Sequence, residues 1–512
     1  MRKTPPLLGF ACGMLACMWS ASAGEDRAAA TRSTRETVTT RTSSIDSRTS
    51  LETPRYTLEE AILTALQQNP DILRARQEIE RTKGVYLEFR AQALPRLDAN
   101  ATFQDTDPHL TSAGGGGFSF SGGAERTYSL NIQASQVVFA GGRIVSQIKV
   151  ADFQRDTSYY AFRNAVDQVI STVKQQFYLV VLDRALIGVQ EESVRLLETQ
   201  LKDQENRFEA GTVPRFNVLQ AQVALSNQLP QLISARNNYR IAQIQLAKTL
   251  GLDFNPLRGE KAPIDAVGEM TFQPRNMPLL QAIEVAKRNR PFLKQQKAIV
   301  LSNAGQADVA RAGFFPQLNA TGGYDFRSSP LTDNIRKVRE GYVFGGTGSW
   351  AIWDWGETYG RWKQARAVLE ESKITLDDSG RQVELEVQQA FSNLLQGREL
   401  IQSQTKNVEQ ANEALRLATA RLSAGAGTQL EVLDARVQLT TARSTQLQAL
   451  YTYNTAVAEF DRVTATEIKY SSELDEPATR RKLKTDKKPT PAPKPTPLTL
   501  TGRHAPPPDE SR

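Results

Sequence analysis

The chain has 512 residues, of which 40 % are hydrophobic and 7 % aromatic, and its formal net charge is +7. After the first twenty residues, no continuous apolar run reaches the roughly 20 residues that a helix needs to cross a bilayer. These features exclude a helical membrane protein. The positive charge does not predict nucleic-acid binding, because much of it lies near the two ends of the chain.

Residues 1–23 have the pattern of a secretory signal peptide. Arg2 and Lys3 precede an apolar run that is followed by the small-residue cleavage site Ala21-Ser22-Ala23. Both cysteines of the chain fall inside this segment, so the mature protein is expected to lack disulfides and cysteine-bound metals. A second interpretation makes Cys17 a lipidated first residue, because residues 14–17 loosely resemble a lipoprotein cleavage sequence.

Residues 24–54 are rich in Thr, Ser and Arg, and residues 468–512 are rich in Pro and Lys. Segments of such composition cannot bury enough apolar surface to fold. Proline at every second position from Pro489 to Pro497 also favours an extended polyproline II conformation. Both segments are therefore expected to be disordered.

The middle of the chain contains an internal duplication. A helix-starting proline and a helix-ending Pro-x-Leu sequence each recur after 221 residues, at Pro70 and Pro291 and at Pro95 and Pro316. An R-x-x-x-G sequence and a V-L-x-A sequence each recur after 214 residues, ending at Gly211 and Gly425 and at Ala221 and Ala435. We interpret residues 55–255 and 277–467 as two repeats, joined by a linker at 256–276.

Each repeat changes to strand periodicity after its Pro-x-Leu sequence. Apolar and small polar residues alternate over about 96–140, around a glycine-rich loop at 114–117, and again over about 317–354. Each repeat thus contains one hairpin with an apolar and a polar face. Two interpretations fit: a hairpin that lies on helices, or membrane strands with the apolar face toward lipid and the polar face toward a lumen.

Helical periodicity then returns for a long stretch. Phe162, Val166, Val169 and Val173 follow a 4-3-4 spacing, which is typical of helices that pack as coiled coils. A helix over about 160–210 would be roughly 75 Å long. It turns at residues 211–214 and returns over about 215–250, where Pro230 is expected to bend it. The tips of the two helical hairpins are predicted at about 207–219 and 421–433.

Two hairpins supply only four strands, and an open sheet edge cannot face lipid because its backbone groups would be unsatisfied. Membrane-inserted strands therefore require several chains. The doubled plan and its recurring sequences resemble the TolC-like outer-membrane efflux proteins, or outer membrane factors, over about residues 56–465. The resemblance implies a mixed α/β membrane protein: a homotrimer with a 12-stranded outer-membrane β-barrel, four strands per chain, and a long periplasmic α-helical coiled-coil tunnel.

The resemblance also implies a function in the Gram-negative cell outer membrane. Such a protein is the exit duct of a tripartite efflux or type I secretion system. It passively conducts cargo from an inner-membrane pump (RND, ABC or MFS type) and a periplasmic adaptor, or membrane fusion, protein to the exterior, and it contacts outer-membrane lipid. The alternative hypothesis is a periplasmic coiled-coil adaptor or scaffold. Neither enzyme activity nor a cofactor, metal or nucleic-acid partner is expected, since the sequence contains no catalytic or metal-binding motif.

Two acidic residues beside the second turn are candidates for a periplasmic gate. By the resemblance, Glu431 and Asp434 form an acidic ring at the closed end of the tunnel, where threefold symmetry would gather six carboxylates and favour cations. The first repeat carries the uncharged Asn217 and Gln220 at these positions. In the alternative interpretation, both acids are ordinary first-turn residues stabilised by the helix dipole.

The two turns are the candidate adaptor-docking tips. Gly211 and Gly425 are expected to adopt left-handed conformations that end the outgoing helices. Near them, Arg207 and Arg421 either face carbonyls at the helix ends or reach the adaptor. The docking assignment rests on the resemblance and comprises Arg207, Gly211, Thr212, Val213, Pro214, Arg421, Gly425, Ala426 and Gly427. At Gly427 the sequence departs from those family members in which an arginine latches the closed state.

Overall fold

A computed structural model describes residues 54–105, 126–252, 264–328 and 338–466. The expected signal peptide, the two expected disordered segments, Cys17 and the glycine-rich loop at 114–117 lie outside the described residues. None of the helices in these ranges combines the length and the apolar character needed to cross a membrane.

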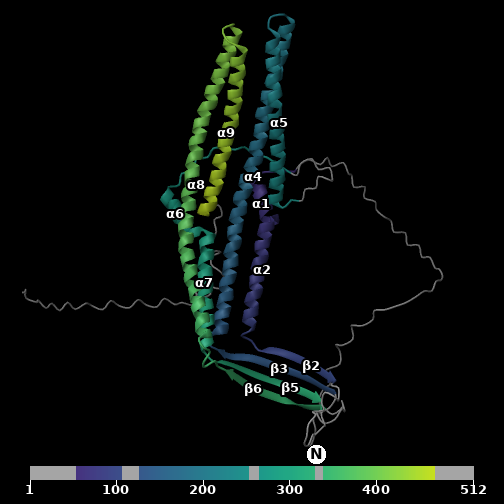
Figure 1. Cartoon of the computed structure of the whole chain (residues 1–512), viewed down its shortest axis with the longest axis vertical. Coiled ribbons are helices and arrows are strands. Elements are labelled where there is room, and N and C mark those ends of the chain that lie inside the picture. Colours follow the sequence, from purple (N-terminus) through teal and green to yellow (C-terminus); the bar gives the residue numbers. More distant parts are fainter. Residues whose placement is uncertain (1–53, 106–125, 253–263, 329–337, 467–512) are drawn as a thin grey trace, which may run out of the picture. The chain divides into compact units, whose positions relative to one another are not determined.

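The same order of elements occurs twice along the described chain (Figure 1). The first set comprises β1 (Arg55–Tyr56), α1 (Leu58–Gln68), α2 (Pro70–Ala91), β2 (Arg96–Asp105), β3 (Arg126–Ala140), α4 (Arg143–Glu209) and α5 (Arg215–Leu250). The second comprises β4 (Asp265–Ala266), α6 (Leu279–Asn289), α7 (Pro291–Arg311), the 3-10 turn η2 (Ala312–Phe314), β5 (Gln317–Ser328), β6 (Val338–Ser349), α8 (Glu357–Ser423) and α9 (Gln429–Thr464).

The long helices match in length between the two sets. Helices α4 and α8 each have 67 residues, and α5 and α9 each have 36. The outgoing helix α4 begins at Arg143, well before the position near 160 that the sequence pattern predicts, so it is about 100 Å long at 1.5 Å per residue. It starts directly after Gly142, whose left-handed φ of +85° turns the chain from strand to helix.

Helices α1 and α2 are separated by a break with a clear chemical cause. Asn69 ends α1 and caps α2: its Oδ1 accepts hydrogen bonds from the backbone N–H groups of Asp71 and Ile72, at 2.8 and 3.3 Å. Pro70 follows at the first helical position, where a missing N–H has no cost. The Asn69 amide also donates to the Thr249 carbonyl at 2.7 Å, which ties the break to the end of α5.

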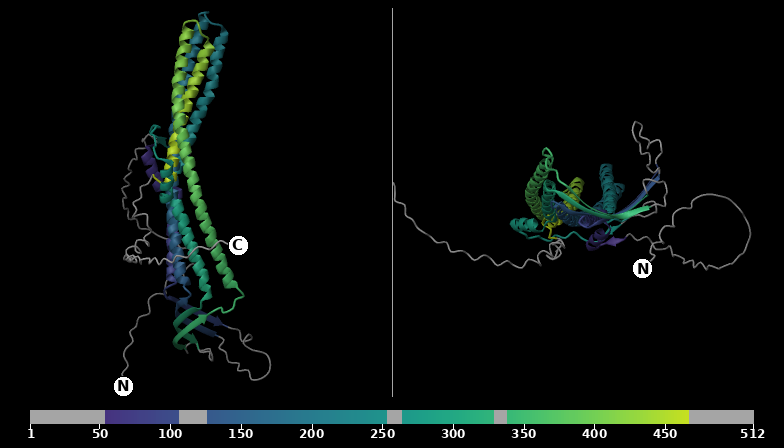
Figure 2. Two further views of the ribbon diagram at one scale, coloured as in Figure 1. Left: turned by 90° about the vertical axis from the view of Figure 1, so that its left-hand side faces the viewer. Right: turned by 90° about the horizontal axis from the view of Figure 1, so that it is seen from below.

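Each set has its own hydrophobic core, formed by its short first helix and its two long helices. The first core contains Ala61 of α1, Val173 of α4 and Leu246 of α5, all fully buried. The second contains the residues that stand at the corresponding offsets of 221 and 214, which are Ala282, Val387 and Phe460. Burial of such side chains contributes about 1.5–3 kcal/mol each. The helices α4 and α9 then join the two hairpins side by side (Figure 2).

The four long strands form one antiparallel sheet in the order β2-β3-β5-β6, at the end of the helices opposite the hairpin tips (Figure 1). The β3–β5 pair therefore connects strands from both element sets. The described sheet is open, so β2 and β6 are its edges. The register shifts between Val137 and Phe139, which marks a bulge near the helical end of β3.

The register places apolar and polar residues on opposite faces of this sheet. One row across the four strands consists of Ala99, Ile132, Tyr324 and Tyr342, and the next row consists of Asn100, Asn131, Asp325 and Gly341. Apolar-face side chains are open to the surroundings: Leu97 is 72 % exposed and Phe344 is 78 % exposed. On the polar face, Asp325 is only 8 % exposed. The hairpins therefore do not lie with their apolar face on helices, which removes the first of the two interpretations.

The second hairpin ends earlier than the alternation predicts. The expected strand region reached residue 354, whereas β6 ends at Ser349. The reason is a helix start: the Asp354 carboxylate accepts hydrogen bonds from the N–H groups of Gly356 and Thr358, at 3.0 and 2.8 Å, ahead of α8. Trp355 has a left-handed φ of +52°, which is incompatible with a strand. The apolar alternation through Trp350 and Ile352 thus belongs to a junction rather than to a strand.

Candidate functional site

The two hairpin tips are built by the same turn. Gly211 and Gly425 have φ values of +72° and +74°, the left-handed conformation expected for glycines that end helices. The N–H of the next residue bonds back to the arginine carbonyl in both tips: Thr212 to Arg207 at 2.9 Å and Ala426 to Arg421 at 2.9 Å. Open carbonyls at the ends of α4 and α8 are satisfied in this way.

The arginines of the two tips have different partners. Arg207 Nε lies 3.0 Å from an Asp203 carboxylate oxygen one turn earlier in α4. Arg421 donates to the Ala426 carbonyl at 3.3 Å and lies 3.7 Å from a Glu431 carboxylate oxygen. Thus only the second tip has an ion pair that joins its outgoing and returning helices. In the described ranges, no hydrogen bond or ion pair joins the docking residues of one tip to those of the other.

Gly427 is a glycine because the turn is tight. A Cβ at this position would lie 3.0 Å from Arg421 Cβ and 3.1 Å from the Leu422 backbone nitrogen, which is closer than side chains normally approach. The second tip therefore folds its end directly onto α8. An arginine at 427 would need this contact to open, which gives a physical reason for the departure from the family pattern.

The two candidate gate residues lie one turn apart at the start of α9. Thr428 caps this helix by accepting a hydrogen bond from the Glu431 N–H at 3.3 Å. The Glu431 side chain is 42 % exposed and faces Arg421, and the Asp434 carboxylate accepts a hydrogen bond from the Gln438 amide at 2.7 Å. Their carboxylates have separate partners. Asn217 and Gln220 occupy the corresponding first turns of α5.

A groove of about 850 Å³ lies between the two helical hairpins behind these residues, lined by α4, α5, α8 and α9. Two arginines of α9 cross it. Arg443 lies 2.8 Å from a Glu192 carboxylate oxygen, and Arg436 donates to the Leu196 carbonyl at 3.2 Å and to the Gln200 amide oxygen. Burial lowers the pKa of the Arg436 guanidinium, as expected for a cation taken out of water.

These bridging residues were missed in the sequence. Their signal is a spacing: Arg436 and Arg443 are seven residues apart, one heptad, so they lie on one face of α9. That face differs from the one formed by Val432, Leu439 and Ala442, which are buried. Helix α9 therefore has an apolar seam toward α8 and a polar seam toward α4.

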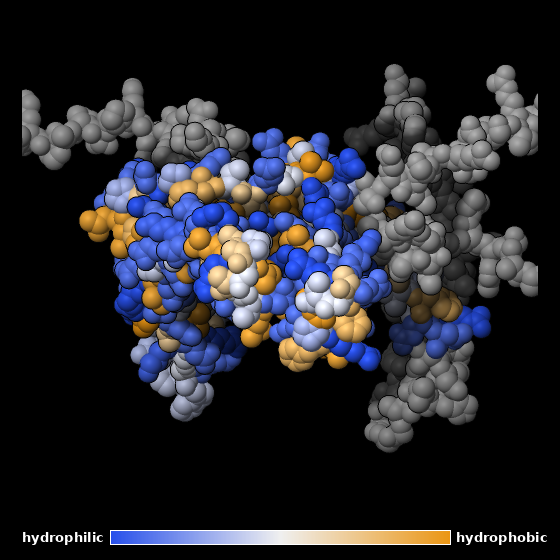
Figure 3. All heavy atoms as spheres, turned by 90° about the horizontal axis from the view of Figure 1, so that it is seen from above, coloured by the Kyte–Doolittle hydropathy of each residue, from blue (hydrophilic) through white to orange (hydrophobic). Residues whose placement is uncertain are grey.

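Seen from the tip end, the molecule is mostly hydrophilic, with separate hydrophobic side chains between the charged ones (Figure 3). Two large hydrophobic residues stand out here by exposure. Phe216 is 69 % exposed and Leu430 is 61 % exposed, and they occupy the same position after each turn, 214 residues apart. Each tip thus presents one apolar side chain beside its glycine turn.

The fold and these tips agree with the known proteins most similar to the chain. The profile of the family described as outer membrane efflux protein matches residues 61–252 and 282–466. The chain belongs to this family. It is therefore an outer-membrane channel of efflux and secretion systems, with a helical extension into the periplasm. The expected function and location are confirmed, and the adaptor alternative is set aside.

Individual relatives are distant. The probable efflux pump outer membrane protein TtgC of Pseudomonas putida is 23 % identical over 75 % of this chain and 78 % of its own length. The alkaline protease secretion protein AprF of Pseudomonas aeruginosa is 26 % identical over 58 % of this chain and 61 % of its own. The crystal structure of the CmeC outer membrane channel of Campylobacter jejuni superposes with a TM-score of 0.73 at 17 % identity, over 83 % of this chain and 88 % of that one.

Proposed function

We propose that this family member works as a homotrimer in which three four-stranded sheets close a single 12-stranded barrel. The open amphipathic sheet carries this proposal. Its apolar face is exposed, and its edge strands β2 and β6 each have one side without a strand partner among the described residues. In lipid, unpaired backbone groups cost several kcal/mol each, so β6 of one chain must pair with β2 of the next.

The same sheet assigns the two faces of the barrel. Exposed Leu97 and Phe344 face lipid, and the row of Asn100, Asn131 and Asp325 lines the lumen. Aromatic residues at the junction of sheet and helices mark one membrane boundary: Trp353 and Trp355 are 76 % and 90 % exposed and touch at 5.7 Å between ring centroids. The helices then project into the periplasm, away from the lipid.

The gate is proposed at the free ends of the helical hairpins. Glu431 and Asp434 of three chains form an acidic ring that favours cations at the tunnel entrance. The bridges from Arg436 and Arg443 to α4 hold the α8–α9 hairpin against the α4–α5 hairpin. Opening requires the α9 tip to move outward, so it must break these bridges or shift them to new partners.

The tips are proposed to dock a periplasmic adaptor. Each offers a rigid glycine turn, an arginine and one exposed apolar side chain, Phe216 or Leu430. Such a patch provides an apolar anchor surrounded by polar groups, which is how protein interfaces are commonly built. The adaptor in turn connects the duct to an inner-membrane pump of the RND, ABC or MFS type. We infer a passive conduit without catalytic function.

Cross-linking of edge strands tests the trimer. The chain has only two cysteines, Cys12 and Cys17, both in the expected signal peptide. One introduced cysteine in β2 (Thr102→Cys) and one in β6 (Gly345→Cys) should allow a bismaleimide to link neighbouring chains in intact membranes, giving bands up to a trimer and none larger. A matched control in paired strands, Ile132→Cys with Tyr324→Cys, should link within one chain only. Edge variants that never exceed the monomer would refute the shared barrel.

A further inference from the structure

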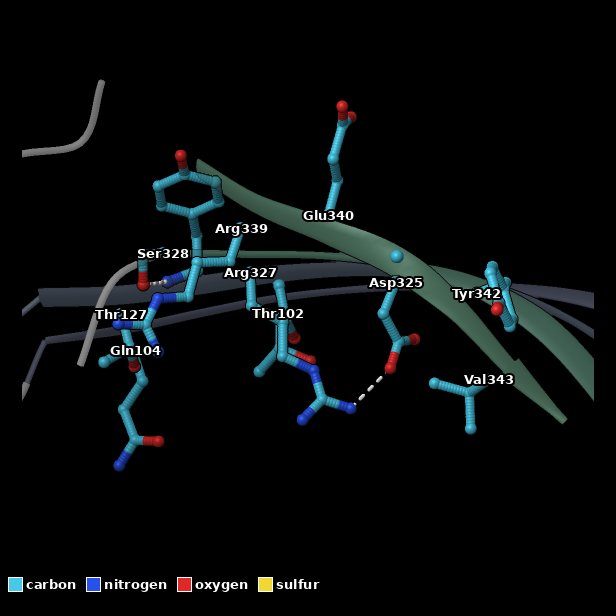
Figure 4. A pocket seen from close by; sticks show the side chains of 13 residues that line it. Thr102, Gln104, Thr127, Asp325, Arg327, Ser328, Arg339, Glu340, Tyr342 and Val343 are labelled. Carbon is cyan, nitrogen blue, oxygen red and sulfur yellow. Dashed lines mark hydrogen bonds and ion pairs between the residues drawn. The ribbon is translucent and has the colours of Figure 1, made fainter. Parts of the chain in front are cut away.

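Two arginines face each other at the loop end of the sheet. Arg327 of β5 and Arg339 of β6 are direct cross-strand partners, in a row that continues through Ser129 to Thr102. The row lies on the polar face, and the side chains of Gln104, Arg327 and Asp325 extend to the same side of the sheet (Figure 4). In both hairpins this end of the strands is the one farther from the helices.

The charges of this arginine pair are only partly compensated. Like charges directly opposite in an antiparallel pair are destabilising. Arg327 donates to the Asp325 carboxylate at 2.5 Å, whereas Arg339 makes no hydrogen bond or ion pair with any described residue. The nearest acid in sequence, Glu340, points to the opposite side of the sheet (Figure 4). One guanidinium per chain therefore faces the polar side without a partner in the described part of the molecule.

Space for a ligand exists beside these arginines. A hollow of about 610 Å³ is lined by Arg327, Arg339, Asp325 and polar residues of β2 and β3. The next residues of β6 on this face are small: Gly341, Val343 and Gly345. A guanidinium carries five N–H donors and binds carboxylate or phosphate oxygens in pairs. The hollow is thus suited in size and chemistry to an oxyanion.

We propose that Arg327 and Arg339 form an oxyanion-binding ring at the outer mouth of the lumen. This inference rests on the trimeric channel proposed above: three copies place six guanidinium groups and three Asp325 carboxylates around one pore. The lumen then has opposite charge at its two ends, acidic at the periplasmic gate and basic at the exterior. Polyvalent oxyanions, such as phosphorylated or polycarboxylate solutes, are drawn into the outer mouth and occupy it.

Block of the pore by inorganic tripolyphosphate tests the ring. Purified full-length protein is added to one side of a planar phosphatidylcholine bilayer, and tripolyphosphate is then added to each side in turn. We expect block from the side that the barrel loops face, at a concentration at least about tenfold lower than from the helical side. Arg339→Gln should raise the blocking concentration about tenfold, the effect of losing one charged hydrogen-bond donor. Arg339→Lys, which keeps the charge, should retain most of the block.

Two controls isolate the arginine pair. Arg96→Gln removes a polar-face arginine at the helical end of the sheet, already held by Asp98 at 2.7 Å, and Glu340→Gln removes a charge beside Arg339 on the opposite face. Both should be blocked like the unmodified protein. A conducting Arg339→Gln variant that is blocked as well as the unmodified protein would overturn the ring and leave the channel intact. Failure of the unmodified protein to conduct would instead contradict the proposed trimer.

Discussion

Replacing Asp183 by asparagine should stabilise the folded protein at neutral pH but not in acid. Asp183 lies in α4 and is only 7 % exposed. It makes no hydrogen bond or ion pair with any residue of the described ranges, and burial raises its pKa from 3.8 to about 6. The pKa of the Tyr451 hydroxyl in α9 is raised by its own burial and by the nearby Asp183 carboxylate. A buried carboxylate without a partner opposes folding whenever it is charged.

The magnitude follows from the pKa. A change of one pH unit in a pKa corresponds to about 1.4 kcal/mol in the free energy of unfolding, so a rise from 3.8 to about 6 sets an upper bound near 3 kcal/mol. Since water reaches part of the site, we expect about 1–2 kcal/mol per chain. The unfolded chain releases this proton at lower pH than the folded chain. Stability is therefore lost as the pH rises from about 4 to about 6, and the loss is complete above that range.

Thermal or urea unfolding of the detergent-solubilised protein, followed by circular dichroism, measures this effect. Asp183→Asn should unfold later than the unmodified protein at about pH 7.5, and the gain should vanish at about pH 4. Asp378→Asn is the matched control, because its side chain on α8 is 71 % exposed; its stability should be nearly unchanged at both pH values. A destabilised Asp183→Asn variant at neutral pH, or a gain of equal size in acid, would refute the reasoning.

Three further predictions concern the tips and the seam between the hairpins. Glu431→Gln with Asp434→Asn should lower cation selectivity in planar bilayers, and an unchanged reversal potential would remove both residues from the lumen. Arg436→Ala with Arg443→Ala should increase single-channel conductance by releasing α9 from α4, whereas Arg416→Ala, whose partner Glu413 lies on the same helix, should not. Gly425→Ala should cost about 1 kcal/mol of stability, because its φ is +74°; chemical denaturation that detects no loss would argue against a strained turn.

The arrangement of elements was largely predictable from local chemistry. Pro70 and Pro95 bound a helix because proline restricts the backbone on either side of it, and the two left-handed glycines end the outgoing helices at the positions expected from R-x-x-x-G. The two-residue alternation also identified the strands and their two faces. These features depend on neighbours in sequence, so the sequence alone carries them.

The errors and omissions have a common physical cause. Apolar alternation continues through Trp350 and Ile352, but hydrogen bonds from the Asp354 cap end the strand earlier. The bridges of Arg436 and Arg443 to α4 depend on contacts about 240–250 residues away in sequence. Asp183 likewise gains its raised pKa only from burial between helices. Local patterns do not report such long-range contacts.

Single-channel recording tests the central claim most directly. The protein, purified from the outer membrane in detergent, should insert into a planar lipid bilayer and produce discrete conductance steps of one size, as a closed trimeric barrel requires. A bilayer that stays electrically silent although the protein has inserted would contradict a continuous channel.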